Sequence, residues 1–117
     1  MIIHQIKFSL INAADKPDEE KAYECEQFQS ALMNNIEKQK LPITSARLDD
    51  VEITGGYDST VKSVAVSFDA DTQTGKLVVE FSDGTAGVVG FDDLDVVVTY
   101  INGETLFVEI APAMPFV

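Results

Sequence analysis

Residues 61–111, VKSVAVSFDADTQTGKLVVEFSDGTAGVVGFDDLDVVVTYINGETLFVEIA, decide the fold because three turn signatures separate their apolar runs. The signatures are DTQTG at 71–75, DG at 83–84 and NG at 102–103. The two short pairs favour type I′ turns, which need a positive φ at both central residues, so we expect Gly84 and Gly103 to have positive φ. The longer signature is typical of a type I turn closed by a bulge, with Gly75 in the left-handed position. Together these turns predict an antiparallel meander in the second half of the chain.

Two-residue loops would also set the register of the two later hairpins. In the first of them we expect Val79 to face Val88, and in the second we expect Val98 to face Phe107. A slip of one residue moves every side chain of a strand to the opposite face of the sheet. These pairs therefore also predict which side chains share one face of the sheet.

The first half of the chain predicts one strand and one long helix. Residues 2–11 alternate between apolar and polar side chains, the pattern of a strand with one buried face. Asp15 and Pro17 are typical of a helix start, and the helix should run from about 16 to 39. Its apolar side chains recur at spacings of three and four: Ala22, Cys25, Phe28, Leu32 and Ile36. Residues 45–54 give a weaker signal, which we interpret as a short or bulged edge strand.

The expected fold is a single α+β domain over residues 1–117. It has one N-terminal strand, one long helix, and then a four- to five-stranded antiparallel meander curled around the helix. No apolar run approaches the roughly 20 residues of a membrane span, and the first residues, MIIHQIK, lack the pattern of a secretory signal. With one cysteine the chain forms no internal disulfide. We therefore expect a cytoplasmic protein.

The charge balance favours a basic partner. Twenty acidic residues against eight basic ones give a net charge of −12, spread along the whole chain. Such a surface repels phosphate backbones and anionic lipids, which disfavours binding of nucleic acids or membranes. The densest acidic run, Asp92, Asp93 and Asp95, is the candidate binding patch and should form part of one continuous acidic face. The alternative is that this run is a solvated loop and that the acidic surface serves solubility alone.

The residues that could carry catalysis are few. His4 is the only histidine and lies on the apolar side of the first strand, where we interpret it as structural. Cys25 lies between Glu24 and Glu26, whose carboxylates raise the pKa of a thiol and make it a poor nucleophile. Two Cys and His residues in total cannot build a four-ligand zinc site, and residues 68–75 lack the glycine and glutamate positions of a calcium loop. We therefore expect no metal, no cofactor and no enzymatic activity.

Both faces of the last hairpin are apolar, which predicts a homodimer. The helix can cover only one face, and an uncovered face would forfeit several kcal/mol, roughly the net stability of a domain. The expected dimer contacts are Val97, Leu106, Val108, Met114 and Phe116. The alternative is a sheet that closes on itself and hides both faces within one chain.

Three functional classes remain. The first is a small acidic protein that acts by binding another protein, for example as an inhibitor or immunity-type binder of a basic partner. The second is a self-assembling structural component that uses its apolar second face. The third is a small-ligand binding protein or enzyme with a cavity between helix and sheet. The scarcity of catalytic residues favours the first class.

Overall fold

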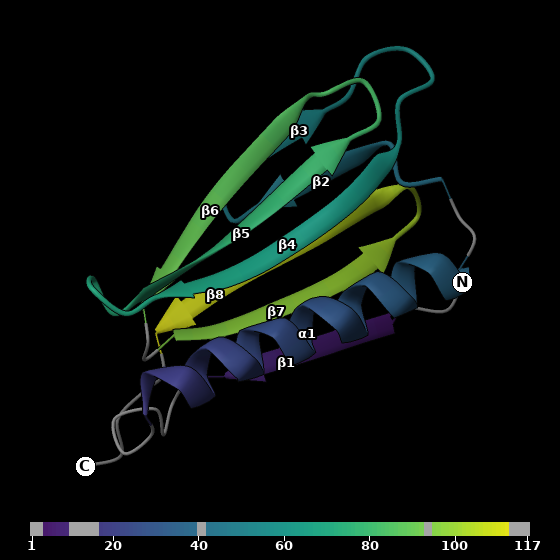
Figure 1. Cartoon of the computed structure of the whole chain (residues 1–117). Helices are drawn as coiled ribbons and strands as arrows, with labels where there is room; N and C mark the ends of the chain where they lie inside the picture. The colour runs from purple at the N-terminus through teal and green to yellow at the C-terminus, as the bar shows by residue number, and fades with distance from the viewer. Residues whose placement is uncertain (1–3, 10–16, 40–41, 93–94, 113–117) are drawn as a thin grey trace.

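The computed structural model describes residues 4–9, 17–39, 42–92 and 95–112, which form one helix and eight strands (Figure 1). In chain order these are β1 (His4–Ser9), α1 (Asp18–Gln39), β2 (Ser45–Leu48), β3 (Val51–Thr54), β4 (Val61–Asp69), β5 (Thr74–Phe81), β6 (Ala86–Asp92), β7 (Asp95–Asn102) and β8 (Thr105–Pro112). The predicted α+β class is confirmed. Within the described part of the chain, no helix has the length and apolar character needed to cross a bilayer.

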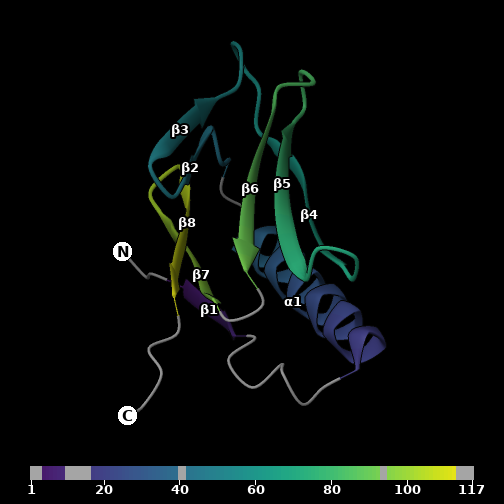
Figure 2. The same cartoon turned by 90° about the vertical axis from the view of Figure 1, so that its left-hand side faces the viewer.

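The strands form two sheets rather than one curled meander. The five-stranded sheet has the order β1-β7-β8-β2-β3, and the three-stranded sheet has the order β4-β5-β6. Figure 2 shows the two sheets as separate layers, with α1 beside β4. The chain follows a meander through β4, β5 and β6 and then crosses to the other sheet as the β7–β8 hairpin. The three-stranded sheet therefore covers one apolar face of the β7–β8 hairpin, which the single helix could not cover alone.

The core lies between the two sheets and is closed on one side by α1. The three-stranded sheet contributes buried side chains such as Leu77 and Phe81, and the five-stranded sheet contributes Val97 and Leu106. From the helix come Cys25, Phe28 and Leu32, three members of the predicted stripe, all at most 4 % exposed. The stripe begins differently from the prediction, because Ala22 is exposed and Lys21 is buried.

The turn between β5 and β6 has three residues instead of the predicted two. The N–H of Gly84 donates to the carbonyl of Phe81 at 3.0 Å, and the N–H of Phe81 donates to the carbonyl of Thr85 at 2.8 Å. Gly84 has a φ of 92°, as predicted, but it forms a bulge after a type I turn. The predicted pairing of Val79 with Val88 is therefore wrong by one residue. Val79 pairs with Gly87, and Val88 lies on the outer face of the sheet.

The turn between β7 and β8 starts one residue later than predicted. Asn102 pairs with Thr105, so Gly103 and Glu104 form the loop, and only Gly103 has a positive φ, at 66°. This is the pattern of a type II′ turn, which takes glycine at its first central position. The predicted pairing of Val98 with Phe107 is wrong by two residues, since Phe107 pairs with Tyr100. A shift of two preserves the face of every side chain.

The turn between β4 and β5 uses a different residue from the one predicted. Gln73, with a φ of 55°, takes the left-handed position that the sequence assigned to Gly75. Gly75 lies inside β5, where a Cβ would overlap the ring of Phe91 on β6. Its function is therefore to make room for that ring.

Candidate functional site

The outer face of the five-stranded sheet carries an aromatic pair at its centre. In the strand register Tyr100 on β7 faces Phe107 on β8, which faces Arg47 on β2, which in turn faces Glu52 on β3. The two rings stack with centroids 4.8 Å apart and an interplanar angle of 5°. Both aromatic residues are half-buried, and Arg47 and Glu52 are exposed. The row therefore presents a flat aromatic surface next to charged side chains.

Carboxylates surround this aromatic pair. The hydroxyl of Tyr100 donates to Glu109 Oε1 at 3.1 Å. Desolvation is the main cause that raises the pKa of Tyr100 above its ordinary value, and the hydrogen bond to Glu109 and its negative charge add to this. Tyr100 is therefore a neutral hydroxyl at physiological pH, and its donated hydrogen bond holds the carboxylate in place.

The turn between β2 and β3 adds two further carboxylates to the same surface. Asp49 has a φ of 57°, and its N–H donates to the carbonyl of Val108 at 2.8 Å, which fixes the turn against β8. Asp49 and Asp50 line a hollow of about 490 Å³ together with Arg47, Tyr100, Phe107, Val108, Glu109, Ile110 and Ala111. We call this region the aromatic–acidic face: Arg47, Asp49, Asp50, Glu52, Tyr100, Phe107 and Glu109. It offers one guanidinium and four carboxylates around a stacked aromatic pair.

The predicted acidic patch lies elsewhere, at the connection between β6 and β7. Asp92 is exposed and Asp95 is half-buried, and a carboxylate oxygen of Asp95 accepts a hydrogen bond from the N–H of Asp92 at 2.6 Å. Asp95 therefore shapes this connection. Asp93 lies outside the described residues. The continuous acidic face predicted for the three residues stays a prediction.

The predicted dimer contacts on the last hairpin are interior residues. Val97 and Leu106 are 0 % exposed and Val108 is 1 % exposed, because all three face the three-stranded sheet across the core. They are not available to a second copy of the chain. Met114 and Phe116 lie outside the described residues. The side chains that share the outer face of this hairpin are the neighbours of Tyr100 and Phe107.

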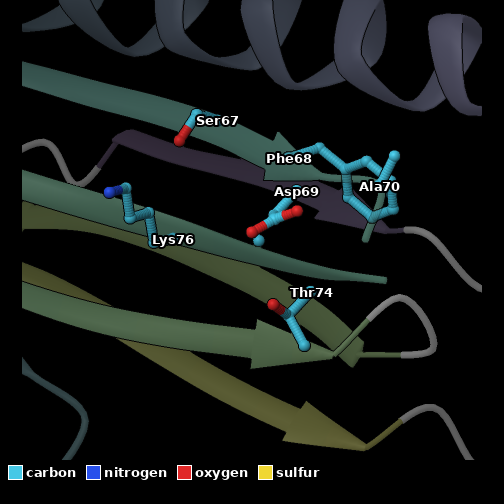
Figure 3. Close-up of a pocket in the computed structure, with 7 residues that line it drawn as sticks. Ser67, Phe68, Asp69, Ala70, Thr74 and Lys76 are labelled. Atoms are coloured by element: carbon cyan, nitrogen blue, oxygen red, sulfur yellow. The ribbon is translucent and has the colours of Figure 1, made fainter. Parts of the chain in front are cut away.

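A second hollow, of about 400 Å³, lies at the hairpin between β4 and β5 (Figure 3). Its polar lining comes from Ser67, Asp69, Thr74 and Lys76. One oxygen of Asp69 accepts a hydrogen bond from the N–H of Asp71 at 2.9 Å, which stabilises the turn. No hydrogen bond among these four side chains joins a hydroxyl to a base, the arrangement that nucleophilic catalysis needs. The polar side chains that line this hollow therefore form a solvent-exposed hairpin surface without a catalytic arrangement.

Of the two candidate catalytic residues, the structure describes the side chain of Cys25. Burial is the main cause that raises the pKa of Cys25 to about 11, and the neighbouring Glu24 adds to this effect. The thiol is thus protonated at neutral pH. His4 pairs with Ile101 in the backbone register of the five-stranded sheet. Among the described residues, no group of three or more His, Cys, Asp and Glu side chains is placed to hold a metal ion.

One further aromatic residue is fully presented to solvent. Tyr57, 97 % exposed, lies in the loop between β3 and β4. Asp83 fastens this loop to the turn between β5 and β6, because its carboxylate accepts hydrogen bonds from the N–H groups of Gly56 at 2.6 Å and Thr85 at 3.0 Å. These two bonds are the main causes that lower the pKa of Asp83 to about 2. The backbone next to Tyr57 is therefore fastened to the turn between β5 and β6.

Part of the aromatic–acidic face could be recognised from the sequence pattern. Tyr100 and Phe107 alternate with buried residues along their strands, which places both on the second face of the last hairpin. Arg47, Asp49 and Asp50 gave no such signal, because their position beside Phe107 depends on the parallel pairing of β2 with β8. Comparisons with protein-family models, with curated proteins and with solved structures gave no match.

Proposed function

We propose that this protein acts by binding a basic partner protein through the aromatic–acidic face. The observation that supports this proposal is the stacked pair of Tyr100 and Phe107 within a ring of carboxylates. Aromatic residues and arginine are enriched at the centres of protein interfaces, where rigid rings bury much area at little entropic cost. The stack and the bond from Tyr100 to Glu109 already restrict these side chains before a partner arrives.

The charge of the face and of the whole chain favours a basic partner. Four carboxylates against one guanidinium surround the rings, and the net charge of −12 adds a long-range field of the same sign. Such a field accelerates encounter with a cationic protein and disfavours anionic ones. The aromatic centre then supplies the apolar contact that keeps the complex together.

The first experiment is capture of proteins from the source cell by the immobilised chain. We expect a basic protein to bind at low salt, about 50 mM, and to be released at about 500 mM, where the Debye length is only a few Å. The double substitution Tyr100→Ala and Phe107→Ala should reduce capture at least about tenfold. Tyr23→Ala is the matched control, because Tyr23 is an exposed tyrosine on the helix, 59 % exposed. Capture that survives the double substitution contradicts the proposal.

A second experiment uses the purified complex to separate the electrostatic contribution to binding from the aromatic one. Asp49→Asn with Glu109→Gln should slow association and flatten its dependence on salt, because these charges steer the encounter. The aromatic substitutions should instead accelerate dissociation. A complex whose association rate does not depend on salt contradicts the electrostatic part of the proposal.

A further inference from the structure

The outer edge of β6 carries backbone groups that face away from the sheet. The bond from the N–H of Phe81 to the carbonyl of Thr85 marks this as a hydrogen-bonded pair, and such pairs alternate along an antiparallel ladder. Gly87, Val89 and Phe91 therefore bond to β5, and the N–H and C=O groups of Ala86, Val88, Gly90 and Asp92 point outward. The bond from the N–H of Asp92 to Asp95 agrees with this alternation, because it leaves the sheet on the outer side.

The available part of this edge is short and symmetric about Val88. The Asp95 carboxylate occupies the outward N–H of Asp92, and the turn at Thr85 ends the strand on the other side. Of the described residues, none gives a hydrogen bond to the outward groups of Ala86, Val88 or Gly90, and all three residues are exposed. Val88 is 62 % exposed. The free donors and acceptors thus belong to three residues, with Val88 in the middle.

The same edge lacks the features that protect edge strands. Natural edge strands carry charges or prolines, or are covered by another element. No charged residue and no proline occurs from Ala86 to Phe91. The opposite edge strand, β4, is covered by α1, whose Gln29 and Met33 accept hydrogen bonds from its outward N–H groups.

We propose that a second copy of the chain pairs with β6 along this edge, antiparallel and with a two-fold axis at Val88. Val88 would face Val88 of the second copy, and Ala86 would face Gly90 of the second copy. Each of the three residues then uses both its N–H and its C=O, which gives about six backbone hydrogen bonds across the axis. The two three-stranded sheets become one continuous sheet. The pairing is independent of the aromatic–acidic face, which lies on the other sheet.

The occupant follows from the symmetry and the charge of the edge. A two-fold axis requires a segment that is complementary to itself, and the set of Ala86, Val88 and Gly90 meets this requirement with small or apolar side chains. A basic peptide would find no carboxylate among these three residues to select it. The uncharged edge also lets two copies of a chain of charge −12 approach along this strand.

The test measures the mass of the protein by sedimentation at protein concentrations from about 1 µM to about 1 mM. Amide hydrogen exchange is measured over the same concentration range. We expect the mass to rise from 12.8 kDa towards twice that value, because a strand edge alone makes a weak dimer. The amides of Ala86, Val88 and Gly90 should become protected as the dimer forms. Val88→Pro removes an outward N–H that β5 does not use and should weaken association at least about tenfold.

Val88→Lys is the second variant, because it places two like charges at the axis without touching the backbone and should also weaken association at least about tenfold. Ala65→Lys is the control, since it adds the same charge to an exposed position on β4 of the same sheet. A mass of 12.8 kDa at about 1 mM overturns the proposal, as does a dimer that both Val88 variants leave intact. Protection of the same amides by a captured basic protein, with no self-association, would assign the edge to that protein and also overturn it.

Discussion

The two edge strands of the three-stranded sheet, β4 and β6, differ in what covers them. Along β4, Met33 Sδ accepts a hydrogen bond from the N–H of Val64 at 3.2 Å, and Gln29 Oε1 accepts one from the N–H of Val66 at 2.9 Å. Along β6 the outward groups of Ala86, Val88 and Gly90 have no such partners among the described residues. A helix can therefore protect a strand edge with individual side chains, besides covering its apolar residues.

The helix is also fastened to the β4 side at its first turns. The buried ammonium of Lys21 donates to Gln73 Oε1 at 2.6 Å and lies 5.3 Å from the ring centroid of Phe68. Gln73 Nε2 donates in turn to Asp18 Oδ1 at 3.1 Å. The turn between β4 and β5 thus connects directly to the start of α1. On the β6 side, Asp83 fastens the turn between β5 and β6 to the loop between β3 and β4 instead.

The largest expected difference between the two sides concerns core burial. Leu32→Ala should lower the free energy of unfolding by about 2–5 kcal/mol, because Leu32 is 1 % exposed between helix and sheets and its truncation leaves a cavity. Val88→Ala on the open edge should change it by less than about 0.5 kcal/mol. Urea unfolding of both variants measures this contrast. If both variants lost the same free energy of unfolding, the edge of β6 would have to be covered to the same extent as that of β4.

A smaller effect should show how β6 is held without a covering helix. Gly75→Ala should cost about 1–3 kcal/mol, because its Cβ would overlap the buried ring of Phe91 that anchors β6 to the core. Gly90→Ala is the control, since its Cβ would lie 3.7 Å from the nearest atom, an ordinary contact. Thermal unfolding of the pair is the measurement. A destabilised Gly90→Ala variant would contradict this account of the anchoring.

The side-chain cap on β4 should contribute less than either packing effect. Gln29→Ala should destabilise the fold by about 1 kcal/mol, because the N–H of Val66 loses its acceptor in a half-buried position. Gln27→Ala changes an exposed glutamine of the same helix and is the matched control. Amide exchange should accelerate at Val66 in the first variant alone. Unchanged exchange at Val66 would show that the bond is not needed to protect this edge.

The smallest effect is expected at Asp83, because its carboxylate is exposed. Its pKa of about 2 lies below the ordinary value, so the ionised group stabilises the fold above about pH 4 and loses this contribution as the pH falls towards about 2. Asp83→Asn should therefore lower the melting temperature at neutral pH, and the difference from the wild type should vanish near pH 2. Asp58→Asn is the control for the loss of one charge, because Asp58 is an exposed residue of the loop between β3 and β4. A difference in melting temperature that persists near pH 2 would show that the ionised carboxylate of Asp83 is not the source of the stabilisation.

Much of the fold could be predicted from local signals, and the errors have local causes. The apolar periodicity and the turn residues were sufficient for the helix, most of the strands and the positive φ of Gly84 and Gly103. The single edge strand predicted over residues 45–54 is instead two strands, β2 and β3, of which β2 lies inside the sheet. An Asp-Gly pair, however, serves both a type I′ turn and a type I turn with a bulge. The two differ by one residue in loop length, and this difference moves Val88 from the expected place opposite Val79 to the outer face of the sheet, opposite Val78.

The division into two sheets and the candidate site could not be predicted in the same way. Apolar residues on both faces of the last hairpin are equally consistent with a curled sheet, a dimer and a second covering sheet. The choice depends on long-range pairs such as Arg47 with Phe107, which no local pattern encodes. The same pairing brings Asp49 and Asp50 to Glu109. The aromatic half of the site was therefore visible in the sequence, and the acidic half was not.

The pairing of β1 with β7 has a consequence for how the molecule is made. Phe8 pairs with Val97, and β2 pairs with β8, so the five-stranded sheet cannot assemble until the ribosome has released β7 and β8. The meander of β4, β5 and β6 needs only neighbouring segments, and the preceding helix is already available to cover its first edge. Local contacts form faster than distant ones. During synthesis β1 therefore stays unpaired with β7 while the helix and the β4–β6 meander form, and it pairs only after β7 has emerged from the ribosome.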